Sequence, residues 1–301
     1  MPIRPVFNRM PEYGIISPGT RETFTENGLV VFRSAYSTRE ISQLRKRIEQ
    51  MVRNYQPDPA DAADPGPRLR ASASDTSFFL AADAFDAEGK LTCSKMRAIC
   101  EIGHAMHDQD PVFSSFFRRE QLLTMAFMLG IKKPRLIRSR CIFNRTLNGS
   151  QPAPEQDAAV LYTDPEATLC FWIVMADSKP DQGCLLVAAK QHQSPLRRRL
   201  REVNGSLQTD ELDATPLPEC TTRLMLDAGS LVVTHGRLPY LYARNNSSFT
   251  CLAVAVQVID GDSSYPADNW LQRPDEQPVQ GFTPDLDKFP QLAPSDKKRR
   301  R

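Results

Sequence analysis

The chain has 301 residues, of which 41% are hydrophobic and 25% charged, as in an ordinary globular protein. A formal net charge of +2 argues against binding nucleic acid or an acidic membrane through bulk electrostatics. No apolar run reaches the roughly eighteen residues that a membrane-spanning helix needs, so we predict no membrane span.

The first predicted elements are a strand and a helix. Residues 28–33 form a short apolar segment bounded by polar residues, which is typical of a strand. Ser37 and Glu40 have the spacing of a capping box, in which each end of the pair satisfies a free backbone N–H of the other. Apolar residues follow at helical intervals: Ile41, Leu44, Ile48, Met51 and Val52.

Further along, the pattern changes from helices to strands. Residues 55–75 are rich in Pro, Ala, Asp and Ser, which predicts a surface loop. Apolar side chains at helical spacing predict helices over 94–108 and 114–130. Short strands are expected beyond Pro134, over 135–145, 158–162, 168–176, 183–188, 229–235 and 249–259. Helices followed by many short strands predict an α+β domain with a β-sandwich or barrel core.

The end of the chain differs in composition from the rest. Residues 273–301 are rich in proline and finish in a basic run, Lys297-Lys298-Arg299-Arg300-Arg301. We predict one domain over 1–272 and a disordered tail over 273–301. The basic run has the composition of a nuclear localisation signal, although solvated tails of this composition are more common.

The seven cysteines indicate a reducing compartment. They form no CxxC pair, and most lie inside apolar segments. The amino terminus also lacks the apolar core of a secretory signal. We therefore expect reduced, buried thiols and a cytoplasmic location.

One motif carries chemical information: Pro154-Glu155-Gln156-Asp157-Ala158-Ala159-Val160-Leu161-Tyr162-Thr163-Asp164-Pro165. Zinc, P-loop and serine-hydrolase motifs are absent from the sequence. With Phe24–Val31, Ile102–Phe113, Ser139–Phe143, Gly183–Leu185, Gly229–Gly236 and Asn269–Gln272, the motif resembles the phytanoyl-CoA dioxygenase family. The similarity is greatest to the branch of phytanoyl-CoA dioxygenase domain-containing protein 1.

This resemblance implies a double-stranded β-helix with flanking amino-terminal helices. Family members hold Fe(II) with a His-x-Asp motif and a distal histidine, which leaves open positions for 2-oxoglutarate and O₂. A later arginine pairs with the distal carboxylate of 2-oxoglutarate. The resemblance also suggests a hydrophobic small molecule as substrate class.

Carried onto this chain, the family's site is incomplete. The first ligand position is Glu155, Asp157 is retained, the distal histidine position is Tyr240, and the arginine position is Cys251. A glutamate adds negative charge where the family has a neutral imidazole, and a tyrosine with an ordinary pKa of about 10 is a poor Fe(II) ligand. No basic residue occurs in 249–256, so a shifted alignment does not recover the arginine.

Four further expectations concern the surroundings of this site. Alternation along a strand would put Glu155 and Asp157 on the same side. His235 is a possible substitute metal ligand, although a structural or pocket-lining role is the simpler interpretation. We expect His192 to line the pocket through hydrogen bonds, and Trp172 to lie in the core with an edge on the pocket.

Three functional hypotheses follow. The first is a degenerate family member that binds a small hydrophobic molecule or a protein partner, with no metal or 2-oxoglutarate as cofactor. The second is a divergent but active oxygenase that uses Fe(II), 2-oxoglutarate, Glu155, Asp157 and His235. The third is a non-oxidative isomerase or lyase that works through acid–base chemistry of Glu155, Asp157 and Tyr240.

Overall fold

The computed structural model describes residues 6–7, 9–60, 72–143, 153–178, 184–243 and 251–283. The predicted loop at 55–75 is described only at its two ends, and the basic run at 297–301 lies outside the described residues. Across the described ranges, none of the helices combines the length and hydrophobicity needed to cross a bilayer.

The described helices are α1 (Pro18–Asn27), α2 (Thr38–Asn54), α5 (Lys95–Ala98), α6 (Met106–Gln109), α7 (Pro111–Phe117), α8 (Glu120–Met128), α9 (Asp157–Val160) and the short 3₁₀ helix η1 (Gln191–Gln193). The strands before α9 are β1 (Val6–Phe7), β2 (Leu29–Phe32), β3 (Thr76–Leu80), β4 (Ile99–His104) and β5 (Pro134–Phe143). Those after it are β6 (Thr168–Val174), β7 (Leu185–Val187), β8 (Arg198–Val203), β9 (Ser206–Glu211), β10 (Thr222–Leu224), β11 (Leu231–His235), β12 (Tyr240–Tyr242) and β13 (Cys251–Asp260).

Two sheets enclose the centre of the fold. The larger has eight strands in the order β1-β2-β11-β6-β13-β5-β4-β3, and the smaller has three in the order β10-β7-β12. Side chains on β6 alternate between the faces of the large sheet: Phe171 and Ile173 join one apolar cluster, and Cys170 and Trp172 join another. The second cluster also contains Val187 of the small sheet, so it is the core between the two sheets.

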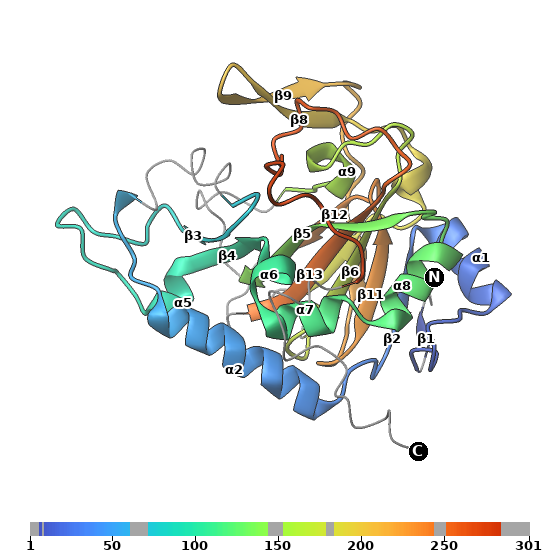
Figure 1. Ribbon diagram of the computed structural model, residues 1–301, viewed down its shortest axis with the longest axis horizontal. Helices are drawn as coiled ribbons and strands as arrows, with labels where there is room; N and C mark the ends of the chain where they lie inside the picture. Colours follow the sequence, from blue (N-terminus) through green and yellow to red (C-terminus); the bar gives the residue numbers. More distant parts are fainter. Residues whose placement is uncertain are drawn as a thin grey trace.

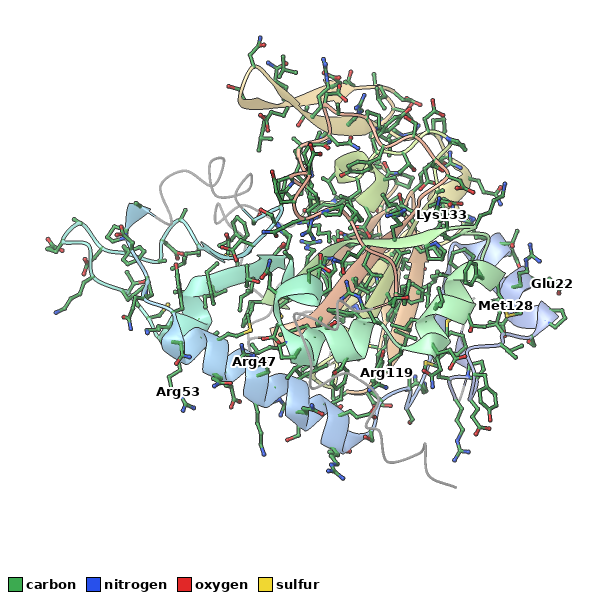
Figure 2. The ribbon with its side chains drawn as sticks, viewed as in Figure 1. Glu22, Arg47, Arg53, Arg119, Met128 and Lys133 are labelled. Carbon is green, nitrogen blue, oxygen red and sulfur yellow. The ribbon has the colours of Figure 1, made fainter. Side chains whose placement is uncertain are left out.

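Helices cover the other face of the large sheet (Figure 1). The capping box of α2 is present, because the Ser37 Oγ accepts from the Glu40 backbone N–H while the Glu40 carboxylate accepts from the Ser37 N–H. Arg47 of α2 binds Asp110 at 2.5 Å, and Arg119 binds Glu40 at 2.5 Å. Both arginines are labelled in Figure 2. The capped helix is thus fixed to the segments around α7 and α8.

Two predicted elements are wrong. The segment predicted as a helix over 94–108 contains the short helices α5 and α6, with strand β4 between them. β4 pairs with both β3 and β5, and this pairing overrides the helical spacing of a short apolar run. The segment predicted as a strand over 158–162 begins with the helical turn α9.

Two other segments differ from the predicted boundaries. The helix predicted over 114–130 is divided into α7 and α8 near Arg118. The arginine run at 197–201, where we predicted no strand, belongs mainly to the β8–β9 hairpin at the top of Figure 1. Its guanidiniums pair with carboxylates there, as Arg197 does with Asp213 at 2.5 Å.

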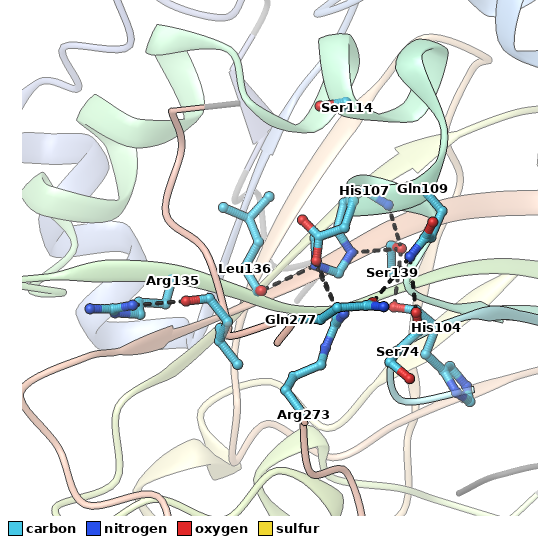
Figure 3. Close-up of polar contacts among 12 residues, drawn as sticks. Ser74, His104, His107, Gln109, Ser114, Arg135, Leu136, Ser139, Arg273 and Gln277 are labelled. Atoms are coloured by element: carbon cyan, nitrogen blue, oxygen red, sulfur yellow. Dashed lines mark hydrogen bonds and ion pairs between the residues drawn. The ribbon is translucent and has the colours of Figure 1, made fainter. Parts of the chain in front are cut away.

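The domain extends beyond 272. Residues 273–283, which we placed in a disordered tail, instead return across α6 and β5. Arg273 binds Asp108 at 3.0 Å, and the Leu136 N–H donates to the Gln280 carbonyl at 2.9 Å. Figure 3 shows Arg273 and Gln277 beside His107 and Gln109. The part of the predicted tail from 284 onward lies outside the described residues.

Candidate functional site

The fold brings three predicted site residues together. Glu155 and Tyr240 form an isolated antiparallel bridge, with backbone N–H to carbonyl distances of 2.8 and 2.9 Å. Asp157 opens α9 two residues later, so strand alternation does not place it as we expected. Its Oδ1 nevertheless accepts a hydrogen bond from the Tyr240 hydroxyl at 3.0 Å.

The carboxylate of Asp157 is surrounded by neutral donors. Besides Tyr240, the Gln257 side-chain amide of β13 donates to the same Oδ1 at 2.6 Å. Burial, followed by the nearby Asp157 charge, raises the pKa of the Cys170 thiol of β6 well above its usual range. Asp157 is 2% exposed, so these donors take the place of solvent.

Two arginines of β5 lie beside this network. Arg138 and Arg140 are two residues apart and therefore project from the same face of the strand. Both bind Glu101 of the neighbouring strand β4, with Nη2 to carboxylate distances of 3.1 Å for Arg138 and 2.5 Å for Arg140. Arg140 also donates from Nη1 to the Tyr240 hydroxyl at 3.3 Å.

The protonation states follow from burial and these partners. Burial alone would raise the pKa of Glu101, but Arg140 and Arg138 hold it well below its usual range. Burial, followed by the charge of Asp157, raises the pKa of Tyr240 well above its ordinary value. The Tyr240 hydroxyl therefore keeps its proton and acts as a donor to Asp157.

Glu155 differs from its neighbours because its side chain retains solvent contact. Desolvation by the surrounding protein nevertheless raises its pKa, and Arg140 opposes that shift. Among described residues, none donates a hydrogen bond to this carboxylate.

His235 is not directed at Asp157. Its Nδ1 accepts from the Arg237 backbone N–H at 3.1 Å, and its Nε2 lies 3.4 Å from a carboxylate oxygen of Glu166. Burial, then His192 and Arg237, lower the pKa of His235 to about 3, while burial raises that of Glu166 to about 7. Both ring nitrogens already have partners, Arg237 and Glu166, so the geometry gives no support to His235 as a third metal ligand.

His192 lies beside His235. Its ring centroid is 5.2 Å from that of His235, and its Nε2 donates to the Thr25 carbonyl at 3.1 Å. Gly28 ends α1 with a left-handed φ of 75°, and a Cβ there would lie 2.5 Å from the His192 ring. Glycine is therefore needed both for the helix end and for seating this ring.

Trp172 and Cys251 mark two further predicted positions. Trp172 is 1% exposed, donates from Nε1 to Thr234 Oγ1 at 2.9 Å and meets the Tyr240 ring edge-on at 5.1 Å. It is therefore a core residue that packs against Tyr240. Cys251 lies opposite Phe143 at the start of β13, and its side chain is outside the described part of the chain.

A serine, a histidine and an aspartate also line up around β5. His107 Nδ1 is 2.9 Å from Ser139 Oγ, and His107 Nε2 is 3.2 Å from Asp108 (Figure 3). Ser139 and His107 are both fully buried, and Nε2 also contacts the Leu136 carbonyl at 3.1 Å. Because no substrate can reach the hydroxyl, this arrangement stabilises the fold instead of forming a catalytic triad.

The sequence contains signals for the residues that we did not predict. Arg138 and Arg140 are charges at alternate positions between the apolar pairs Leu136-Ile137 and Cys141-Ile142, which indicates one polar face. Gln257 is the lone polar residue within Val254–Ile259. These three residues come together through the strand register, in which Gln257 lies opposite Arg138 on β5 and Cys170 on β6.

The site does not fit the family's metal. In the described ranges, no group of three or more His, Cys, Asp and Glu side chains could hold a metal ion. The three ligand positions carry two carboxylates and a protonated tyrosine, and Oδ1 of the Asp157 carboxylate accepts hydrogen bonds from Tyr240 and Gln257. β13 also contributes no cationic side chain for 2-oxoglutarate.

The fold is similar to those of solved structures whose sequences are distant from this chain. The EctD structure from S. alaskensis with 2-oxoglutarate and 5-hydroxyectoine has a TM-score of 0.58 at 17% identity, and 92% of each chain is covered. The carbocyclase SnoK from nogalamycin biosynthesis has a TM-score of 0.56 at 15% identity, covering 91% of this chain and 95% of that one. These similarities confirm the double-stranded β-helix.

Sequence comparison shows the family to which the chain belongs. A profile described as phytanoyl-CoA dioxygenase (PhyH) matches residues 24–250, and the chain belongs to this family. It is 30% identical to phytanoyl-CoA dioxygenase 1 of Oryza sativa subsp. japonica, with 88% of this chain and 96% of the relative covered. It is 27% identical to phytanoyl-CoA dioxygenase domain-containing protein 1 of Bos taurus, with 87% and 97% covered.

Proposed function

We propose that this family member no longer performs iron- and 2-oxoglutarate-dependent oxygenation and acts as a binding or regulatory module. The observation that carries the proposal is the pair of hydrogen bonds from Tyr240 and Gln257 to Asp157 Oδ1, at 3.0 and 2.6 Å. A metal would need this carboxylate and two further ligands to face one point. Here the carboxylate that is retained from the family motif is engaged by neutral donors, and Tyr240 is one of them.

The surroundings of the site also disfavour 2-oxoglutarate. A bound dicarboxylate needs a cationic partner, and removal of one partner from a buried ion pair costs about 3–5 kcal/mol. The guanidiniums of Arg138 and Arg140 are the nearest described cations, and both are already bound to Glu101. We therefore expect neither iron nor 2-oxoglutarate as a resident cofactor.

The surroundings of Glu155 support a binding role. The exposed Glu155 is bridged to Tyr240, whose ring packs against Trp172, and Tyr242 also meets the Trp172 ring edge-on at 6.0 Å. Ligand sites commonly pair aromatic side chains with a few polar groups. We propose a small hydrophobic molecule as the ligand, or a protein partner that covers Glu155. The free, mostly buried cysteines among the described residues suit a cytoplasmic location.

The two other hypotheses receive less support from the geometry. An active oxygenase built on Glu155, Asp157 and His235 would need the His235 ring to leave its contacts with Glu166 and Arg237. Acid–base catalysis would need Tyr240 to exchange its proton, yet burial and Asp157 raise its pKa.

The proposal is tested by incubating the purified protein anaerobically with Fe(II) and 2-oxoglutarate, admitting O₂ and measuring succinate. An active family member assayed in parallel is the positive control. We expect no succinate above the metal-free background. Metal-dependent succinate formation would refute the proposal and favour the divergent oxygenase.

A further inference from the structure

Arg140 lies at the centre of the altered site. Its guanidinium binds Glu101 through Nη2 at 2.5 Å and the Tyr240 hydroxyl through Nη1 at 3.3 Å, and its side chain is 12% exposed. Tyr240 passes a hydrogen bond on to Asp157 at 3.0 Å. A chain of direct contacts thus joins this guanidinium to two of the three ligand positions.

The third ligand position, Glu155, is influenced by the charge of Arg140. Desolvation is the main influence on the Glu155 pKa, and the charge of Arg140 is the largest influence that opposes it. The Arg138 guanidinium instead faces Glu101 and stacks 5.3 Å from the Trp270 ring centroid. Arg140, by contrast, contacts a ligand position directly, through the Tyr240 hydroxyl.

The charges of the cluster require a cation. Glu101 and Asp157 place two largely buried carboxylates beside the ligand positions, and the exposed Glu155 adds a third carboxyl group. Buried carboxylates are stable only when they are paired or hydrogen-bonded. In the family that compensation comes partly from a metal ion, whereas here it comes from side chains of β5.

We infer that the Arg140 guanidinium replaces the metal as the positive charge of this site and excludes a divalent cation from it. The inference rests on the proposed function and deepens it, since it names the residue that keeps the site free of metal. A divalent cation brought next to a fixed guanidinium at low dielectric is repelled by it. Restoring the histidine ligands alone would leave this repulsion in place.

The experiment uses the full-length chain in a series of variants. The first carries Glu155→His and Tyr240→His, the second adds Arg140→Met, and the third adds Arg140→Lys in its place as a matched control that keeps the charge. Mn(II) binding is measured by calorimetry without 2-oxoglutarate. Circular dichroism and thermal melting verify that each variant is folded.

We expect the variant with Arg140→Met to bind Mn(II) at least about tenfold more tightly than the variants that keep a charge at position 140. Equal affinity with and without that charge would overturn the inference. If Arg140→Met prevents folding because Glu101 loses a partner, Glu101→Gln is added to both arms so that the cluster stays balanced. Tight Mn(II) binding by the unmodified protein would instead refute the proposed function, so the two failures are distinguishable.

Discussion

Removing one hydroxyl group tests the network at Asp157. Tyr240→Phe deletes the donor that lies 3.0 Å from Asp157 Oδ1 and the acceptor that lies 3.3 Å from Arg140 Nη1, while the ring and its contact with Trp172 remain. Hydrogen bonds to charged groups contribute about 1.5–3 kcal/mol. Tyr240 is 4% exposed, so water cannot readily replace the lost group.

We therefore expect Tyr240→Phe to lower the free energy of unfolding by about 1.5–3 kcal/mol. The measurement is urea denaturation followed by circular dichroism, with the denaturant slope compared between variants to confirm that only stability has changed. Tyr13→Phe is the matched control, because Tyr13 is 64% exposed and its loss should cost no more than about 0.5 kcal/mol. If the two substitutions cost the same, the hydroxyl does not stabilise Asp157 and the account of the site is wrong.

Three further predictions concern other parts of the molecule. Burial raises the pKa of Glu166 to about 7, so the folded state keeps a proton that the unfolded chain releases near pH 4.5, and stability falls as the pH rises through this window. Glu166→Gln should therefore gain stability over the natural chain, by up to about 3 kcal/mol, between pH 5 and pH 8 in paired denaturation curves; a pH-independent difference would contradict this. Arg273→Ala should speed hydrogen exchange in residues 273–283 while β6 is unaffected, because it removes the contact with Asp108; unchanged exchange would show that other contacts suffice. Ser37→Ala should cost about 1 kcal/mol in denaturant unfolding by removing the capping hydrogen bond of α2, and a cost near zero would show that the cap is not needed.

Local signals in the sequence predicted part of the fold well. The capping box at Ser37 and Glu40 predicted the start of α2, and short segments separated by turn residues predicted β5, β6, β11 and β13. β4 was missed because Ile99 and Ile102 satisfy helical spacing as well as strand burial. Only its pairing with β3 and β5 decides between them, and pairing is not visible in a single short segment.

The site was predicted in part for a similar reason. The family's spacing placed Glu155, Asp157 and Tyr240 in one site, and the structure brings these three together. Arg140 and Gln257 were missed, since neither belongs to the motif and both reach the site through the register of β5 and β13. The family resemblance therefore located the site, while the chemistry that now fills it depends on tertiary contacts.

We propose that this member of the phytanoyl-CoA dioxygenase family has no working metal site. A Mn(II) titration of the unmodified protein in the presence of 2-oxoglutarate, followed by electron paramagnetic resonance, tests it most directly. We predict that the signal of free aqueous Mn(II) keeps its full intensity at every protein concentration. Saturable loss of that signal would show that the metal binds, and would contradict the account.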